Sequence, residues 1–256
     1  MEITITQNIF LRTSQVKQPL GHIWLIHPFG ESGLCYKEAF HAELARKFNL
    51  YVPDLPGFGV TPNNGQPRTM EQLTENLIGL IDATSANNNL FIMAHSVSGL
   101  IGTRLCQHYA EKVKGYVSIE GNLLSFDSYY SSLPIHHSKE DFFKKYTESV
   151  FEHAATRLDF RRYLCSIYFA DVDSMVQWGQ STEKYISHDK PGQAFMALTC
   201  PKLYIWGDKD TPEATQAFIH NNNVPNLHLK GIGHWPMIEA PEAFYGAVSN
   251  FFSSNA

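Results

Sequence analysis

Short apolar runs recur along the chain, and segments with helical spacing separate them. The runs expected to form buried strands are 23–26, 50–52, 90–93, 116–119, 203–206 and 227–229. The segments with helical patterning are 36–48, 70–84, 100–110 and 241–252. Buried parallel strands consist of continuous apolar residues and need helical crossovers between them. The alternation therefore predicts a mostly parallel sheet with helices on both faces.

The first residues follow a different pattern. Ile3 and Ile5 lie two positions apart, and so do Ile9 and Leu11. A period of two is typical of a strand with one buried face. Residues 1–13 are therefore predicted to form an exposed antiparallel hairpin.

A long segment in the second half of the chain lacks strand patterns. Residues 122–195 contain helical stretches instead. The clearest of these are 138–154 and 159–169. Strand and helix patterns alternate again after this segment. We therefore expect one α/β domain, formed by residues 1–121 and 196–256, that a helical insertion of residues 122–195 interrupts.

A serine follows the third buried run directly. The segment Ala94-His95-Ser96-Val97-Ser98-Gly99 lies between a predicted strand and a predicted helix. A sharp turn at this place, the nucleophile elbow, exposes a serine hydroxyl above the sheet. The usual pattern has glycine two positions before and after the serine, where this chain has Ala94 and Ser98. Ser96 is therefore either a nucleophile or a serine that caps the following helix.

The loop after the first buried run is suited to bind an oxyanion. It reads His27-Pro28-Phe29-Gly30. In an elbow fold, a loop at this place donates one backbone N–H to the oxyanion, and the residue after the nucleophile donates another. Proline has no N–H, so Pro28 cannot donate. The predicted donors are Phe29 and Val97.

Two further strand ends are followed by acidic and basic side chains. Gly207-Asp208-Lys209-Asp210 follows 203–206, and Gly233-His234-Trp235-Pro236 follows 227–229. Reactive groups in open parallel sheets gather at the carboxyl ends of the strands. We therefore expect an acid from the first loop and His234 from the second to lie near Ser96.

Taken together, these motifs resemble the α/β-hydrolase superfamily over nearly the whole chain. The order Ser, Asp, His is the order of that superfamily. Asp54-Leu55-Pro56-Gly57-Phe58-Gly59 and the segment 233–242 also resemble loops of its lid-bearing members. The resemblance implies an eight-stranded, mostly parallel sheet flanked by helices, with 122–195 as a helical lid. It also implies a hydrolytic site without a cofactor or a metal.

The resemblance further implies a catalytic triad of Ser96, Asp210 and His234. The superfamily's usual G-x-x-D spacing favours Asp210 over Asp208. Glu120 follows the strand 116–119, where some relatives place their acid. It is therefore an alternative acid or a polar wall of the pocket.

The identity of the nucleophile narrows the reaction. Dehalogenases and epoxide hydrolases of this fold need a carboxylate at position 96, and dienelactone hydrolases need a cysteine. The insertion is rich in Phe and Tyr, which favours an apolar substrate. Arg157, Arg161 and Arg162 are expected on its solvated face. We therefore predict a carboxylesterase that cleaves a small or medium apolar ester or thioester through an acyl-enzyme.

Two other hypotheses fit the same motifs. A carbon–carbon bond hydrolase or an aminopeptidase could use the same triad, and Glu120 would then suit the amine of an aminopeptidase substrate. A small-molecule receptor without turnover is the third, since some plant hormone receptors of this superfamily retain the triad.

Composition excludes other classes of partner. The net charge is −5 and no cluster of Lys and Arg is present, which argues against nucleic acid. The apolar runs are too short to span a bilayer, and the N-terminus lacks the pattern of a signal peptide. The four cysteines include no CxxC pair, which favours free thiols in a reducing compartment. We therefore expect a cytoplasmic protein.

Overall fold

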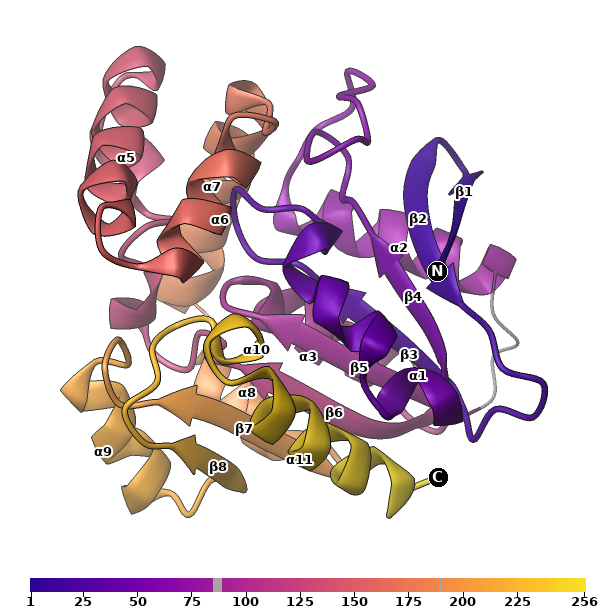
Figure 1. The fold of residues 1–256 in the computed structure, drawn as a ribbon. Helices are drawn as coiled ribbons and strands as arrows, with labels where there is room; N and C mark the ends of the chain where they lie inside the picture. The colour runs from indigo at the N-terminus through magenta and orange to yellow at the C-terminus, as the bar shows by residue number, and fades with distance from the viewer. Residues whose placement is uncertain (85–88, 189) are drawn as a thin grey trace.

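The computed structural model describes residues 1–84, 89–188 and 190–256, and its centre is a twisted sheet (Figure 1). The sheet has eight strands in the order β1-β2-β4-β3-β5-β6-β7-β8. The strands are β1 Glu2–Thr6, β2 Ile9–Ser14, β3 His22–Ile26, β4 Asn49–Pro53, β5 Leu90–His95, β6 Val113–Ile119, β7 Lys202–Gly207 and β8 Asn226–Leu229. Strands β3 to β8 run parallel, and β2 pairs antiparallel with both β1 and β4. The predicted mostly parallel, eight-stranded sheet is confirmed.

Helices cover both faces of the sheet. Those outside the long segment between β6 and β7 are η1 Gly33–His41, α1 Leu44–Lys47, α2 Met70–Thr84, α3 Ser98–His108, α9 Glu213–Asn221, α10 Pro236–Glu239 and α11 Pro241–Ser253. Helices α1 and α11 contact each other on one face, whereas α2 and α3 pack together on the other (Figure 1). The burial of Leu73, Leu77 and Leu80 along α2 shows the helical spacing that the sequence predicts.

One predicted helix differs from the structure. Instead of a continuous helix over 36–48, the chain forms the 3₁₀ helix η1 and the short helix α1. Tyr36 leaves helical dihedral angles within η1. It is buried, and its hydroxyl donates a hydrogen bond to the Ile26 carbonyl at 2.9 Å. Packing against the end of β3 therefore overrides the regular helix.

The N-terminal hairpin is exposed in its first strand only. Ile3 and Ile5 of β1 are exposed, whereas Ile9 and Leu11 of β2 are buried. The prediction of an exposed hairpin is therefore wrong for β2. The reason is that β2 pairs with β4 as well as with β1, so it belongs to the interior of the sheet.

Between β6 and β7, the described residues form helices and no strand. We call residues 120–201 the inserted segment. Its helices are η2 Ser125–Ser128, α4 Leu133–His136, α5 Lys139–Ala154, α6 Leu158–Ile167, α7 Val172–His188 and α8 Pro191–Ala197. Helix α8 runs past the predicted end of the insertion at 195. Helices α5, α6 and α7 stand together beyond one end of the strands (Figure 1).

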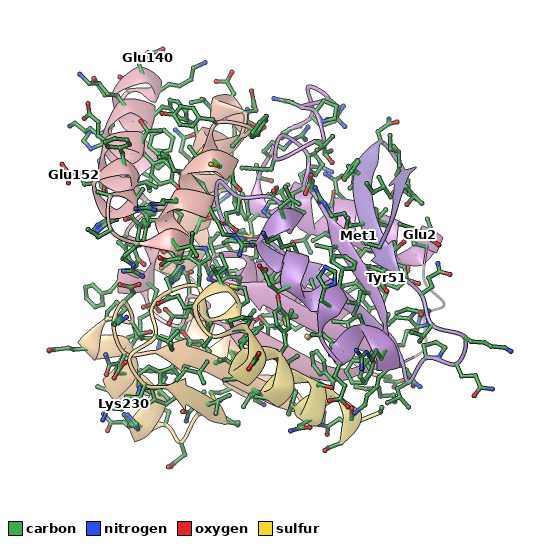
Figure 2. All side chains as sticks on the ribbon, viewed as in Figure 1. Met1, Glu2, Tyr51, Glu140, Glu152 and Lys230 are labelled. Atoms are coloured by element: carbon green, nitrogen blue, oxygen red, sulfur yellow. The ribbon has the colours of Figure 1, made fainter. Side chains whose placement is uncertain are left out.

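The longest helices of the inserted segment are amphipathic. In α5, Phe142, Tyr146 and Val150 are buried, whereas Glu140 and Glu152 extend into solvent (Figure 2). Ser138 caps its first turn, since the Ser138 Oγ accepts the Asp141 N–H at 3.2 Å. The segment therefore has its own apolar interior. None of the helices in the described ranges is long and apolar enough to cross a membrane.

Candidate active site

Ser96 lies in a tight turn between β5 and α3. Its φ of +55° is in the left-handed region, which residues other than glycine seldom adopt. The Ser96 N–H donates to the Ile119 carbonyl at 2.8 Å, and the Gly99 N–H donates to the Ser96 carbonyl at 2.7 Å. Backbone strain of this kind gathers at functional sites, where the surroundings hold it in place. The turn has the geometry of the nucleophile elbow that the sequence predicts.

The structure accommodates Ala94 and Ser98 at the positions where the elbow usually has glycine. A Cβ atom on Gly102 would lie only 2.9 Å from the Ala94 Cβ, so the glycine in α3 leaves room for the alanine. Ser98 is fully buried, and its Oγ donates to the His27 carbonyl at 2.6 Å. The serine therefore links the elbow to the loop that follows β3.

That loop carries the first predicted oxyanion donor. Phe29 is buried and lines the same small cavity as Ser96. Among the described residues, neither the Phe29 N–H nor the Val97 N–H has a protein acceptor. Both groups are therefore able to donate to a substrate oxygen.

Buried polar contacts fix the position of the loop after β3. The His27 Nε2 accepts the Leu55 N–H at 2.9 Å, and its Nδ1 lies 2.9 Å from the Pro28 carbonyl. Burial lowers the pKa of His27 to about 4, so the ring is neutral at physiological pH. In the neighbouring loop, which follows β4, both carboxylate oxygens of Asp54 accept hydrogen bonds from Arg12, at 2.6 and 3.1 Å. The Asp54–Gly59 motif therefore supports the loop of Phe29.

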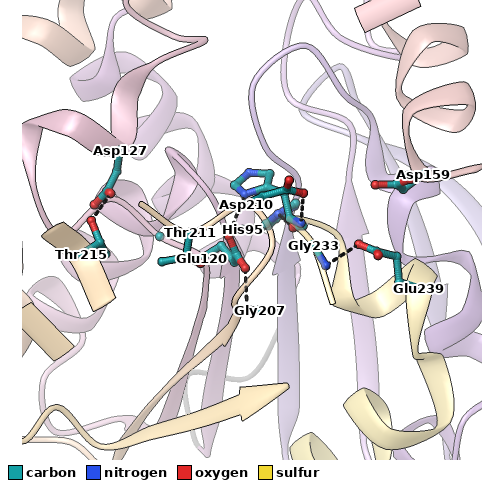
Figure 3. A network of polar contacts seen from close by, with 12 residues as sticks. His95, Glu120, Asp127, Asp159, Gly207, Asp210, Thr211, Thr215, Gly233 and Glu239 are labelled. Atoms are coloured by element: carbon teal, nitrogen blue, oxygen red, sulfur yellow. Dashed lines mark hydrogen bonds and ion pairs between the residues drawn. The ribbon is translucent and has the colours of Figure 1, made fainter. Parts of the chain in front are cut away.

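His234 follows β8, and its ring contacts Glu120. The Nδ1 of His234 lies 3.0 Å from the Glu120 Oε2. The other carboxylate oxygen of Glu120 accepts the Gly207 N–H at 2.7 Å (Figure 3). Glu120 and His234 are both buried. The carboxylate thus fixes the ring and has a hydrogen bond on each oxygen.

Charges around the ring raise its basicity. Burial by itself would lower the pKa of His234, but the hydrogen bond and charge of Glu120, together with the charges of Asp210 and Glu31, outweigh that effect. The pKa of His234 is therefore raised above its ordinary value. His95 lies behind it, with Nε2 at 2.7 Å from the His234 carbonyl. Burial and the charge of His234 hold the pKa of His95 well below its usual range, so the ring is neutral. Because a carbonyl oxygen only accepts, the His95 proton lies on Nε2 and is donated to it.

Asp210 contacts the backbone of His234 and not its ring, unlike the predicted triad. Its Oδ2 accepts the backbone N–H of His234 at 2.9 Å, and the imidazole ring bonds Glu120 instead. Both Asp210 oxygens also bind Arg157, at 3.0 and 2.6 Å. Asp208 has other partners: it accepts the Gly231 N–H at 2.6 Å, and its Oδ2 lies 3.5 Å from the His228 Nε2. The spacing of the motif places Asp210 in the correct loop but does not reveal its partner.

Arg157 is a site neighbour that sequence reasoning missed. It was expected on a solvated face, but only about a quarter of its side chain is exposed. It also binds Asp159, with Nη2 and Oδ2 2.7 Å apart. Asp210 lies 53 residues from Arg157 in the chain, so no local motif could have indicated that contact.

Ser96 and His234 line one small cavity. Its volume is about 20 Å³, room for little more than one water molecule. The other lining residues are Pro28, Phe29, Asp127, Tyr129, Tyr130, Ser131, Tyr163 and Trp235. Five of the ten belong to the inserted segment, so that segment closes the cavity over the serine. A molecule larger than water can enter only after side chains that line the cavity move.

Solved structures with the same fold span the whole chain. The N-acyl homoserine lactonase AidH superposes with a TM-score of 0.78 at 16% identity, covering 100% of this chain and 96% of its own. An esterase from Thermogutta terrifontis gives 0.77 at 17% identity, covering 96% and 94%. The enol-lactonase from Burkholderia xenovorans LB400 gives 0.76 at 15% identity, covering 98% and 100%. At these identities the likeness concerns the fold.

No curated protein sequence is a significant match to this chain. The sequence model described as the alpha/beta hydrolase family matches residues 25–247, which include the elbow and the loops of Phe29, Glu120 and His234. This match covers most of the chain. The chain therefore belongs to the α/β-hydrolase family.

Proposed function

We propose that the protein is a serine hydrolase that cleaves a carboxylic ester or thioester of a small or medium apolar substrate. Ser96 is the nucleophile, His234 the general base and Glu120 the acid that orients the histidine. The observation that carries the proposal is that Ser96, on a strained turn, and His234, held by Glu120, line one cavity.

Acylation begins when the Ser96 Oγ attacks the substrate carbonyl carbon. The Nε2 of His234 takes the serine proton, since Glu120 keeps the other ring proton on Nδ1. The Phe29 and Val97 amides donate to the oxyanion, and each such donor lowers the barrier by about 3–4 kcal/mol. His234 then returns its proton to the leaving oxygen or sulfur as that bond breaks. The acyl group stays on Ser96.

Deacylation repeats the same proton transfers with water. His234 takes a proton from the attacking water, and the second tetrahedral intermediate uses the same two amides. The bond to Ser96 breaks, its oxygen receives the proton from His234, and the carboxylic acid leaves. Over the whole cycle, water supplies the hydroxyl group of the acid and the proton that replaces the one Ser96 gave to the leaving group, so Ser96 and His234 return to their starting states.

The inserted segment fits the role of a lid. Tyr129, Tyr130 and Tyr163 lie over the serine, and the closed cavity has no room for an ester. Their aromatic rings favour an apolar acyl or alcohol group. The named activities of the similar structures, an esterase and two lactonases, support an ester carbonyl as the reacting group. Both oxygens of Glu120 are engaged, so this carboxylate is not free to bind the amine of an aminopeptidase substrate.

Hydrolysis of p-nitrophenyl esters of increasing acyl length tests the proposal. Wild-type enzyme should release nitrophenol with an optimum at short or medium chains, and Ser96→Ala should lose nearly all activity. Ser254→Ala, an exposed serine at the end of the chain, is the matched control and should keep the wild-type rate. A folded wild-type protein that hydrolyses none of these esters, or a Ser96→Ala variant as active as wild type, contradicts the proposal.

A further inference from the structure

An arginine of the inserted segment binds the loop that carries the catalytic histidine. Arg157 lies between α5 and α6 and holds both oxygens of Asp210, with N–O distances of 3.0 and 2.6 Å. The same guanidinium binds both oxygens of Asp159, at 3.3 and 2.7 Å. Two-point contacts of this kind fix the orientation of a carboxylate more firmly than a single ammonium could.

The Asp210 carboxylate contacts His234, the residue that it was expected to orient as the acid of the triad. Its Oδ2 accepts the His234 backbone N–H at 2.9 Å while it also binds Arg157 at 2.6 Å. The Nδ1–H of His234 is a single donor, and it points to Glu120, with Nδ1 and Oε2 3.0 Å apart. Two carboxylates therefore lie beside one histidine, one on its ring and one on its backbone.

The approach of Arg157 requires a glycine in the histidine loop. A Cβ atom on Gly233 would lie 2.3 Å from the Arg157 Nη2 and 2.3 Å from the Asp210 Oδ2. The Gly233 N–H donates to Glu239 at 2.9 Å, and Asp210 and Glu239 both lie close to the glycine (Figure 3). Arg157 faces these two carboxylates and that of Asp159, and without it they would repel one another.

From these contacts we infer that Arg157 is a positioning residue that selects the catalytic acid. By holding both oxygens of Asp210, it commits that carboxylate to the His234 backbone and leaves the ring to Glu120. Since Arg157 belongs to the inserted segment, closure of that segment and alignment of the histidine occur together. This inference rests on the proposed function, because it assumes that His234 is the base for Ser96.

The inference predicts that loss of Arg157 rescues loss of Glu120. In Glu120→Gln, kcat should fall by roughly 10³–10⁴, as in other triads that lose their acid. In Glu120→Gln with Arg157→Gln, Asp210 is free to turn to the ring, and kcat should rise at least about tenfold above the single variant. Adding Asp210→Asn should remove this gain. A role limited to stability predicts the opposite, a further loss when Arg157 is replaced.

The readouts are p-nitrophenyl ester hydrolysis and the rate at which a fluorophosphonate labels Ser96, with thermal melting for each variant. If replacing Arg157 with glutamine unfolds the protein, Arg157→Lys in the Glu120→Gln protein is the milder variant. A lysine keeps the charge but cannot hold both oxygens, so a smaller gain of the same sign is expected.

Two results overturn the inference. One is a Glu120→Gln, Arg157→Gln protein that is folded and no more active than Glu120→Gln. The other is a gain that persists after Asp210→Asn. Failure of the proposed function gives a different pattern, in which Ser96→Ala keeps its activity or wild-type Ser96 is not labelled at all.

Discussion

Replacing Glu120 with glutamine removes one of the two carboxylate oxygens that accept hydrogen bonds in the candidate site. The carboxylate accepts the Gly207 N–H at 2.7 Å on one oxygen and the His234 Nδ1–H at 3.0 Å on the other. A glutamine amide offers one oxygen and one NH₂ donor. If its oxygen stays on Gly207, its NH₂ meets Nδ1, and the ring must carry its proton on Nε2. A protonated Nε2 cannot take the proton of Ser96.

The size of the effect follows from this change of tautomer. In serine proteases, the corresponding amide replacement lowers kcat about 10⁴-fold, which is about 5.4 kcal/mol of barrier. We expect a loss of roughly 10³–10⁴ in kcat for Glu120→Gln. Replacing a hydrogen bond to a charged carboxylate by one to a neutral amide should also lower the free energy of unfolding by about 1–3 kcal/mol, or the Tm by roughly 2–12 °C.

The assay compares Glu120→Gln with Asp210→Asn on one p-nitrophenyl ester, with kcat and KM measured separately. Asp210→Asn keeps an acceptor for the His234 backbone N–H and leaves the ring on Glu120. It should therefore lose far less, on the order of tenfold. The reasoning is refuted if Asp210→Asn loses 10³ or more while Glu120→Gln stays within about tenfold of wild type.

Three further predictions concern pH and stability. Since the pKa of His234 is raised and a protonated ring cannot act as base, kcat/KM should fall as the pH is lowered, with a midpoint above about 6.5. A value of kcat/KM that does not change between about pH 4 and 8 would contradict this. Ser98→Ala leaves the His27 carbonyl without its 2.6 Å hydrogen bond and should lower the free energy of unfolding in urea by about 1–3 kcal/mol; an unchanged midpoint would show that the bond is dispensable. Arg12→Ala leaves the fully buried Asp54 without its cation and should cost about 3–5 kcal/mol by the same measurement, whereas a loss below about 1 kcal/mol would mean that Asp54 is solvated or protonated.

The order of motifs along the chain predicted the fold well. The apolar runs at 23–26 and 90–93 became β3 and β5 because strands buried on both faces need no polar alternation. The prediction of an exposed N-terminal hairpin was less accurate. The exposure of β2 depends on its pairing with β4, and period-two patterning does not encode that contact. The kink at Tyr36 was missed for a similar reason, because its hydroxyl bonds the end of another strand.

In the candidate site, too, local motifs predicted some residues but not the long-range contacts between them. Ser96 and His234 could be predicted because each follows a strand in a short motif, and parallel strands bring their carboxyl ends together. The choice between Glu120 and Asp210 could not be made from spacing. The His234 ring contacts Glu120 because of side-chain direction, and Arg157 reaches Asp210 from a distant part of the chain; spacing encodes neither contact.

The central claim is that Ser96 is a nucleophile activated by His234. The most direct measurement is peptide mapping by mass spectrometry after reaction of the full chain with a fluorophosphonate. The account predicts one phosphonyl group, located on Ser96, with labelling abolished in Ser96→Ala and strongly slowed in Glu120→Gln. Absence of any label on the folded wild-type protein, or a label on another serine with Ser96 unmodified, would contradict it.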